Sequence, residues 1–141
     1  MEQLDPSAPA RVAACACGQL RAVCAGAPPR VFLCACTQCQ RRTGSMFGVS
    51  AFFDRAQVRI EGTAKRWRRS SDSGRHLTFG FCPECGGTVF WEAEVDPDSI
   101  GIAAGTFADP GFPKPQLALW TETKCDWVRL PEGVPVKPAR R

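Results

Sequence analysis

Apolar and polar residues alternate in short runs along this chain, and no long stretch repeats with the period of an amphipathic helix. The runs are rich in β-branched and aromatic residues, a composition that favours β-strands. Within residues 19–25, the side chains of Leu20, Ala22 and Cys24 share one face, so we expect Cys24 to be a buried or half-buried free thiol. The pattern predicts strands at residues 11–15, 19–25, 31–34, 46–53, 58–61, 64–70, 76–81, 88–92, 100–104, 116–119 and 127–130.

Turn-forming residues separate these runs, as at Ala27-Pro28-Pro29 and Asp96-Pro97-Asp98. We expect at most one short helical turn, over residues 37–42. So many short strands in 141 residues predict an all-β fold, a small domain of two packed antiparallel sheets. One domain is expected over residues 1–141, and the proline-rich, basic end at 130–141 predicts a flexible tail.

The composition is that of a globular chain, with 44% hydrophobic and 23% charged residues, rather than that of a disordered one. No apolar run approaches the ~20 residues that span a bilayer, so no membrane partner is expected. The first ten residues lack the apolar region of a secretory signal, which predicts a cytoplasmic location. Because cytoplasmic thiols are kept reduced, the nine cysteines are interpreted as metal ligands or reactive thiols before disulfides.

The most specific local motif is Cys82-Pro83-Glu84-Cys85-Gly86-Gly87, a tight turn that aims two sulfurs at one metal ion. The pair Cys15 and Cys17, followed by Gly18, is the natural donor of the two missing thiolates. Four sulfurs leave no open coordination position, so Cys15, Cys17, Cys82 and Cys85 predict a structural zinc site that stabilises a small β domain. The competing interpretation is that these cysteines are merely small buried residues.

A second cluster, Cys34, Cys36 and Cys39, has no fourth ligand nearby in the sequence. Three protein ligands and one exchangeable position are typical of a reactive zinc site, so the chain is expected to hold two zinc ions, one structural and one catalytic. Two alternatives stay open. One is a redox role without metal. The other is a second structural zinc completed from elsewhere in the fold, by Cys24, Cys125 or His76.

The formal charge of +4 is mild, and two thiolate-bound zinc ions would lower it to about +1. Nucleic acid is therefore not expected as a partner. Basic residues do cluster at Arg41–Arg42 and in the run from Lys65 to Arg69, where the ordinary interpretation is a solvated face and the alternative is a local anion site. Nucleic-acid binding through the second run would require an affinity that falls steeply with salt.

The order of these motifs resembles that of the glutathione-dependent formaldehyde-activating (Gfa) family, also called the Gfa/centromere protein V family. The matching motifs are C-x-C-G, C-x-C-x-x-C-x-R-R, R-S-S-D-S-G and F-C-P-x-C-G-G, within residues 15–18, 34–42, 69–74 and 81–88. The later Ile102–Phe107 segment and the Trp120 to Pro131 ending are also similar, so the resemblance covers nearly the whole chain. The sequence departs from the family at Ala35, where histidine is usual, and at Phe79-Gly80-Phe81, where an arginine is common.

The resemblance implies a zinc-tied β fold and a carbon–sulfur lyase that adds glutathione to formaldehyde, giving S-(hydroxymethyl)glutathione. It implies that Cys34, Cys36 and Cys39 are catalytic, and that the partners are glutathione or a similar small thiol and an aldehyde. Glutathione carries two carboxylates, and Arg41 and Arg42 are the first candidates to bind them. Further candidates are Arg66, Arg68 and Arg69. The alternative is a non-catalytic zinc module that carries glutathione or binds a protein, and we expect a monomer or homodimer in either case.

Overall fold

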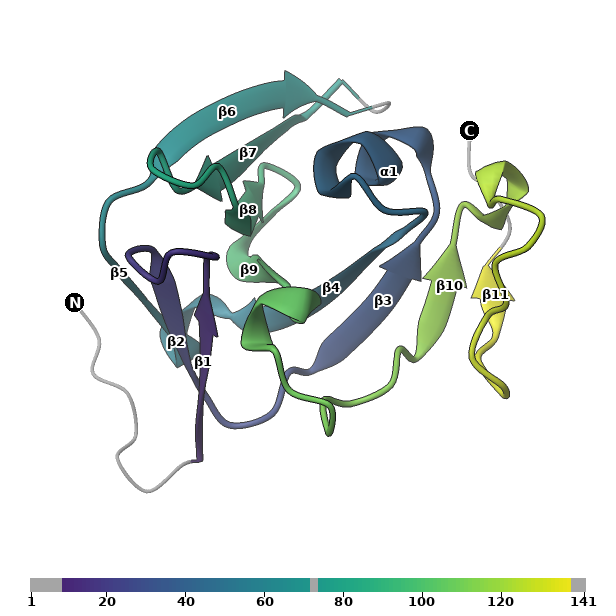
Figure 1. The fold of residues 1–141 in the computed structure, drawn as a ribbon, viewed down its shortest axis with the longest axis horizontal. Coiled ribbons are helices and arrows are strands. Elements are labelled where there is room, and N and C mark those ends of the chain that lie inside the picture. Colours follow the sequence, from purple (N-terminus) through teal and green to yellow (C-terminus); the bar gives the residue numbers. More distant parts are fainter. Residues whose placement is uncertain (1–8, 72–73, 138–141) are drawn as a thin grey trace.

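A computed structural model describes residues 9–71 and 74–137, which fold into two β-sheets (Figure 1). The small sheet has three antiparallel strands in the order β1-β2-β5. Its strands are β1 (Ala10–Ala14), β2 (Arg21–Ala25) and β5 (Val58–Glu61). No helix in the described part of the chain is long and apolar enough to cross a membrane.

The large sheet has eight strands in the order β11-β10-β3-β4-β9-β8-β7-β6. It is antiparallel except at one edge, where β10 runs parallel to both β3 and β11. Its strands are β3 (Arg30–Cys34), β4 (Gly48–Asp54), β6 (Lys65–Ser70), β7 (His76–Phe81), β8 (Thr88–Ala93), β9 (Asp96–Ala103), β10 (Leu117–Leu119) and β11 (Val136–Lys137). The helical elements are α1 (Thr37–Thr43) and the 3₁₀ turns η1 (Arg55–Gln57), η2 (Ala104–Phe107) and η3 (Thr121–Thr123).

The predicted all-β fold with a single short α-helix is confirmed, but the strand predicted at residues 127–130 is wrong. That segment is a turn, closed by a hydrogen bond from the N–H of Val128 to the carbonyl of Cys125. The strand near this end is instead β11, which lies inside the predicted tail and pairs with β10. Residues 138–141 of the tail lie outside the described part, so its flexibility and the single-domain boundary stay predictions.

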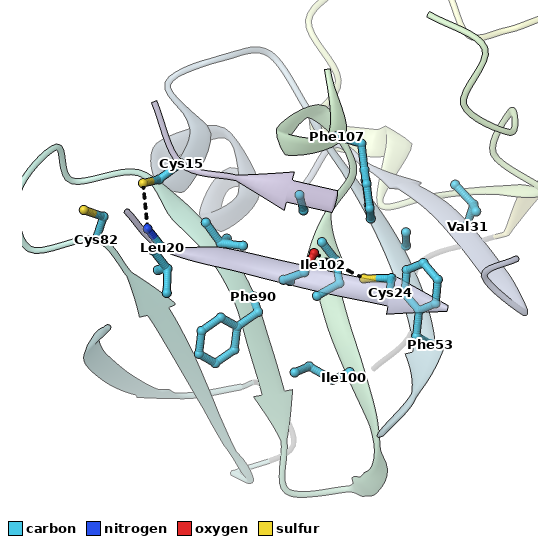
Figure 2. Packing of buried hydrophobic residues seen from close by; sticks show 14 residues of the cluster. Cys15, Leu20, Cys24, Val31, Phe53, Cys82, Phe90, Ile100, Ile102 and Phe107 are labelled. Carbon is cyan, nitrogen blue, oxygen red and sulfur yellow. Dashed lines mark hydrogen bonds between the residues drawn. The ribbon is translucent and has the colours of Figure 1, made fainter. Parts of the chain in front are cut away.

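The hydrophobic core lies between the small sheet and one face of the large sheet (Figure 2). Ala22 and Cys24 of β2, and Leu20 just before this strand, are fully buried against residues such as Phe53 and Ile102, as the alternation predicted. Burial raises the pKa of the Cys24 thiol to about 12. Cys24 is therefore a neutral core residue at physiological pH.

Two glycines allow aromatic rings to lie across neighbouring strands. Phe90 of β8 pairs with Gly80 of β7, and a Cβ atom at Gly80 would stand only 2.3 Å from the Phe90 ring. On the next position of β8, Trp91 pairs with Gly101 of β9, where a Cβ would stand 2.2 Å from the indole. Phe90 packs in the core, whereas Trp91 lines a cavity on the other face of the sheet.

The second face of the large sheet is curved around α1, which lies with β7 on one side and β3 and β10 on the other (Figure 1). Strand alternation assigns side chains to the two faces. On β4, Ala51 and Phe53 belong to the core, whereas Ser50 and Phe52 line the cavity. The large sheet is therefore apolar on both faces, and the small sheet packs against only one of them.

Candidate functional site

The first cysteine cluster joins two turns that are far apart in the sequence. The Sγ atoms of Cys15, Cys17, Cys82 and Cys85 all lie within 4.8 Å of one another. Cys15 and Cys17 come from the turn after β1, and Cys82 and Cys85 from the turn after β7. The structure thus brings together the four sulfurs that the spacing pointed to.

The distances within this cluster fit a tetrahedral zinc ion. The Sγ atoms of Cys15 and Cys17 are 3.7 Å apart, as are those of Cys17 and Cys82. A zinc ion with Zn–S bonds of about 2.3 Å has sulfur–sulfur edges of about 3.8 Å. The residues present therefore fit a closed four-thiolate site, which leaves no coordination position for a substrate.

Hydrogen-bond donors surround the sulfur of Cys82. It accepts bonds from the side-chain amide of Gln19 (3.2 Å) and from the N–H groups of Glu84 (3.3 Å) and Cys85 (3.5 Å). Burial raises the pKa of Cys82, but these donors, with the Cys85 N–H first among them, outweigh burial and lower the pKa to about 6. The surroundings of Cys82 therefore favour the thiolate form, which is the form that binds metal.

Gln19 was not predicted as part of the site. Its Nε2 also donates to the carbonyl of Thr63 (2.6 Å), and its Oε1 accepts from the N–H of Thr63 (3.0 Å). Gln19 therefore links the Cys82 sulfur to the segment between β5 and β6. No local signal in the sequence marks this role, because Thr63 is 44 positions away.

The second cluster forms where β3 meets α1. The Sγ atoms of Cys34, Cys36 and Cys39 all lie within 4.8 Å of one another. In the described part of the chain, no further cysteine, histidine, aspartate or glutamate joins them. Cys24, buried in the core, does not complete the site, and neither do Cys125 and His76. Among the described residues, the cluster thus offers three possible metal ligands.

The three thiols interact with one another directly. Hydrogen bonds from Cys34 and then from Cys39 hold the pKa of Cys36 far below its usual range, and the bond to Cys36 raises the pKa of Cys34. The sulfur of Cys36 also accepts from the N–H of Cys39 (3.3 Å) at the start of α1. The surroundings of Cys36 therefore favour its thiolate form, and thiolates are ligands that suit zinc.

Hydrogen bonds fix the chain between these cysteines. The carbonyl of Ala35 accepts from the side chains of Gln40 (2.9 Å) and Thr123 (2.7 Å), and its N–H donates to the carbonyl of Leu119 (3.1 Å). The Ala35 side chain is fully buried and does not line the cavity. The position where the family usually has histidine therefore contributes no group to the cavity surface.

A cavity of about 480 Å³ adjoins Cys34 and Cys39 on the face of the large sheet opposite the core. Aromatic and aliphatic side chains form most of its wall. The aromatic ones come from five strands and are Phe32, Phe52, Trp67, Phe79 and Trp91. Sequence reasoning did not identify this wall. The available signal was the pairs of consecutive aromatic residues, Phe52-Phe53 and Phe90-Trp91, which indicate strands covered on both faces.

Arg42 is held against the aromatic wall. Its guanidinium carbon lies 4.5 Å from the ring centroid of Trp91 and 5.7 Å from that of Phe79. Gly48 leaves room for it, since a Cβ there would stand 2.9 Å from Nη2 of Arg42. The cation is thus fixed by cation–π contacts beside the cysteine cluster.

Three arginines line the cavity, Arg41 and Arg42 from α1 and Arg69 from β6. None of the three forms an ion pair with a carboxylate in the described part of the chain. The neighbouring candidates Arg66 and Arg68 do not line this cavity, and Arg66 lies 3.6 Å from Glu92. The basic run on β6 is therefore divided between two faces of the strand.

Comparisons with known proteins agree with the arrangement of motifs. Residues 10–123 match the sequence profile of a family described as glutathione-dependent formaldehyde-activating enzyme. No curated protein matches the chain in a sequence search. A crystal structure of a Rhodobacter sphaeroides protein, a structural-genomics target, is similar with a TM-score of 0.55 and 16% identity, covering 89% of this chain and 99% of that one. This likeness supports the fold alone.

Proposed function

Because the chain belongs to the glutathione-dependent formaldehyde-activating (Gfa) family, we propose that it is a zinc-dependent carbon–sulfur lyase. Its reaction would be the addition of a glutathione-type thiol to formaldehyde or a related aldehyde. The observation that carries the proposal is the three-cysteine cluster, which has no fourth protein ligand among the described residues and adjoins a cavity with three arginines.

Two zinc ions would be held by different cysteines. Cys15, Cys17, Cys82 and Cys85 would hold the structural ion. Cys34, Cys36 and Cys39 would hold the catalytic ion. When bound there, zinc supplies an open coordination position at which a thiol loses its proton at neutral pH.

The arginines of the cavity would bind and orient the thiol substrate. Glutathione has two carboxylates, and a guanidinium binds a carboxylate with two parallel hydrogen bonds. Arg41, Arg42 and Arg69 have no competing ion pair among the described residues, so their donors are available to such a ligand. This anchoring would direct the thiol sulfur towards the side of the cavity formed by Cys34 and Cys39.

The reaction forms one carbon–sulfur bond and moves one proton. The sulfur attacks the carbonyl carbon. The thiol loses one proton, and the carbonyl oxygen gains one. Among the described residues, the cavity lining contains no aspartate, glutamate or histidine. While the arginines hold the carboxylates, the hydroxyl of Ser50 and the side-chain amide of Gln38, which also line the cavity, would be the donors to the developing alkoxide.

The proposal is tested by measuring exchange between formaldehyde, glutathione and their adduct by NMR in the presence of the zinc-loaded protein. We expect exchange faster than in buffer, and loss of the acceleration in Cys36→Ser with one zinc ion retained. Cys125→Ser is the matched control, because Cys125 belongs to neither cluster. Exchange at the buffer rate with both zinc ions bound would contradict the proposal.

A second candidate function is a non-catalytic zinc module that carries glutathione or binds a protein. None of the described residues that line the cavity offers a carboxylate or an imidazole, which favours this candidate because such groups are the usual general acids and bases. Calorimetric binding of glutathione without faster exchange would support the carrier.

We also propose a cytoplasmic location, since nine free cysteines suit a reducing compartment.

A further inference from the structure

The cavity is much larger than formaldehyde requires. Its volume of about 480 Å³ lies within the range of pockets for drug-sized molecules, about 300–1,000 Å³. Formaldehyde has only two non-hydrogen atoms and could cover little of the wall. A one-carbon aldehyde would therefore leave most of this apolar surface in contact with water.

The wall is organised as two groups of rings that face the same space. Trp67, Phe79 and Trp91 pair across β6, β7 and β8, with successive ring centroids 6.0 Å and 5.7 Å apart. Phe32 and Phe52 form a second pair on β3 and β4, 5.8 Å apart. These separations are those at which aromatic rings attract one another. Guanidinium groups lie over Phe52, Phe79 and Trp91, so a further ring would join each group on the sides that these cations leave free.

One ring of this wall is exposed. Trp67 lies on β6, the edge strand, and 53% of its surface is accessible, whereas Phe79 and Trp91 are each 6% exposed. No described segment covers Trp67. The aromatic row therefore runs from the interior to the open side of the cavity, as a binding wall for an entering ligand would.

The charged and aromatic parts of the cavity suit different chemical groups. The arginines match the carboxylates of a glutathione-type thiol. The rings do not match its peptide groups, which would lose hydrogen bonds to water against an apolar wall. The aromatic part therefore fits a substituent that arrives with the other reactant, the aldehyde.

We propose that the aldehyde substrate carries an apolar ring, as an aromatic aldehyde does, and that this ring binds between Trp67, Phe79 and Phe52. The inference rests on the proposed function and specifies its substrate class. A bond forms between the thiol sulfur and the aldehyde carbon as the carbonyl π-bond breaks. The S–H bond also breaks, and the carbonyl oxygen takes up that proton and becomes a hydroxyl group. The product is a hemithioacetal, and no oxidant or reductant is needed.

Binding provides a test that does not depend on turnover. The probes are S-benzylglutathione and S-methylglutathione, which share the peptide and differ in the ring, titrated calorimetrically into the zinc-loaded protein. We expect the benzyl compound to bind at least tenfold more tightly. Trp67→Ala should remove most of this preference, whereas Trp127→Ala, which changes a tryptophan 68% exposed and outside the cavity, should not. Trp67→Leu should lose the preference in the same way, and it keeps an apolar residue that suits the strand.

The outcomes separate the inference from the function on which it rests. Exchange NMR is run with benzaldehyde and with formaldehyde, each with glutathione. Exchange of benzaldehyde that is faster with the protein than in buffer, and that Trp67→Ala slows, would support the inference. Equal binding of the two glutathione derivatives would overturn it while leaving an accelerated formaldehyde exchange intact. No acceleration with either aldehyde would overturn the proposed function and the aldehyde assignment with it.

Discussion

The guanidinium of Arg42 lies 4.5 Å from the ring centroid of Trp91, so a cationic side chain of α1 packs against a side chain of β8 in the large sheet. Trp91 can accept it because its own ring lies across Gly101 of the next strand. The guanidinium has no carboxylate partner among the described residues, so its N–H groups can bind the carboxylate of a ligand. A cation fixed in this way loses little entropy when it binds an anion.

Gly48→Ala tests whether this position of Arg42 matters. The new Cβ would stand 2.9 Å from Nη2 of Arg42, and the side chain can move away because that atom is its flexible end. Displacing the guanidinium should weaken glutathione binding by about threefold to tenfold, the effect of impairing one charged hydrogen bond. Isothermal titration calorimetry measures the change. Gly105→Ala, where the added Cβ meets nothing within 4 Å, should bind as the wild type does. Equal affinities in the two variants would contradict this role of Arg42.

Arg69→Gln tests the contribution of β6, with its neighbour Arg68 as the matched control. Arg69 lines the cavity and its guanidinium lies 5.5 Å from the Phe79 ring, whereas Arg68 does not line it. Losing one charge-assisted pair should weaken glutathione binding by about tenfold, or about 1.4 kcal/mol. Arg68→Gln should change it less than twofold. If both variants weaken binding equally, and added salt removes the difference from wild type, the effect is general charge and not a site.

Both cysteine clusters could be predicted because each is made of ligands close in the sequence. Cys34, Cys36 and Cys39 meet within one turn, and each half of the other cluster is a C-x-C or C-x-x-C pair. The fold class could be predicted as well, because the alternation that marks a strand also lies within a few neighbouring residues. Only the joining of residues 17 and 82 required a longer-range assumption, and the count of four thiolates for zinc supplied it.

The cavity could not be predicted, because its wall depends on strand register. Trp67, Phe79 and Trp91 are twelve positions apart in turn, and they form one row only because β6, β7 and β8 pair in the register observed. A shift of one residue would send each ring to the other face. The two-residue strand β11 was missed because it is too short to show alternation.

Gln19→Ala should weaken zinc binding at the first cluster without preventing folding. The variant removes the amide that donates to the Cys82 sulfur at 3.2 Å and holds Thr63. Losing a partner that orients a metal ligand typically lowers affinity about 10–100-fold. Competition against a chromogenic chelator measures this for one zinc equivalent. Gln57→Ala is the control, since Gln57 also donates to backbone carbonyls, those of Ala25 and Ala27, but is far from either cluster. A similar zinc affinity in both variants would show that Gln19 acts only on local stability.

Cys24 should make the protein less stable at alkaline pH. Burial raises the pKa of its thiol from 9.0 to about 12, because the thiolate is disfavoured in the apolar core. The folded state therefore holds a proton that the unfolded chain releases above pH 9. The stability that this proton provides is present below pH 9 and is lost as the pH rises from 9 to 12, with a slope of at most about 1.4 kcal/mol per pH unit. Cys24→Ala lacks the titrating group, so its melting temperature should fall less steeply than that of the wild type between pH 8 and pH 10.5, although the smaller side chain lowers it at every pH. The zinc ligands titrate identically in both proteins and cancel in the comparison. Parallel curves would mean that the thiol at position 24 ionises freely in the folded state, contrary to its burial.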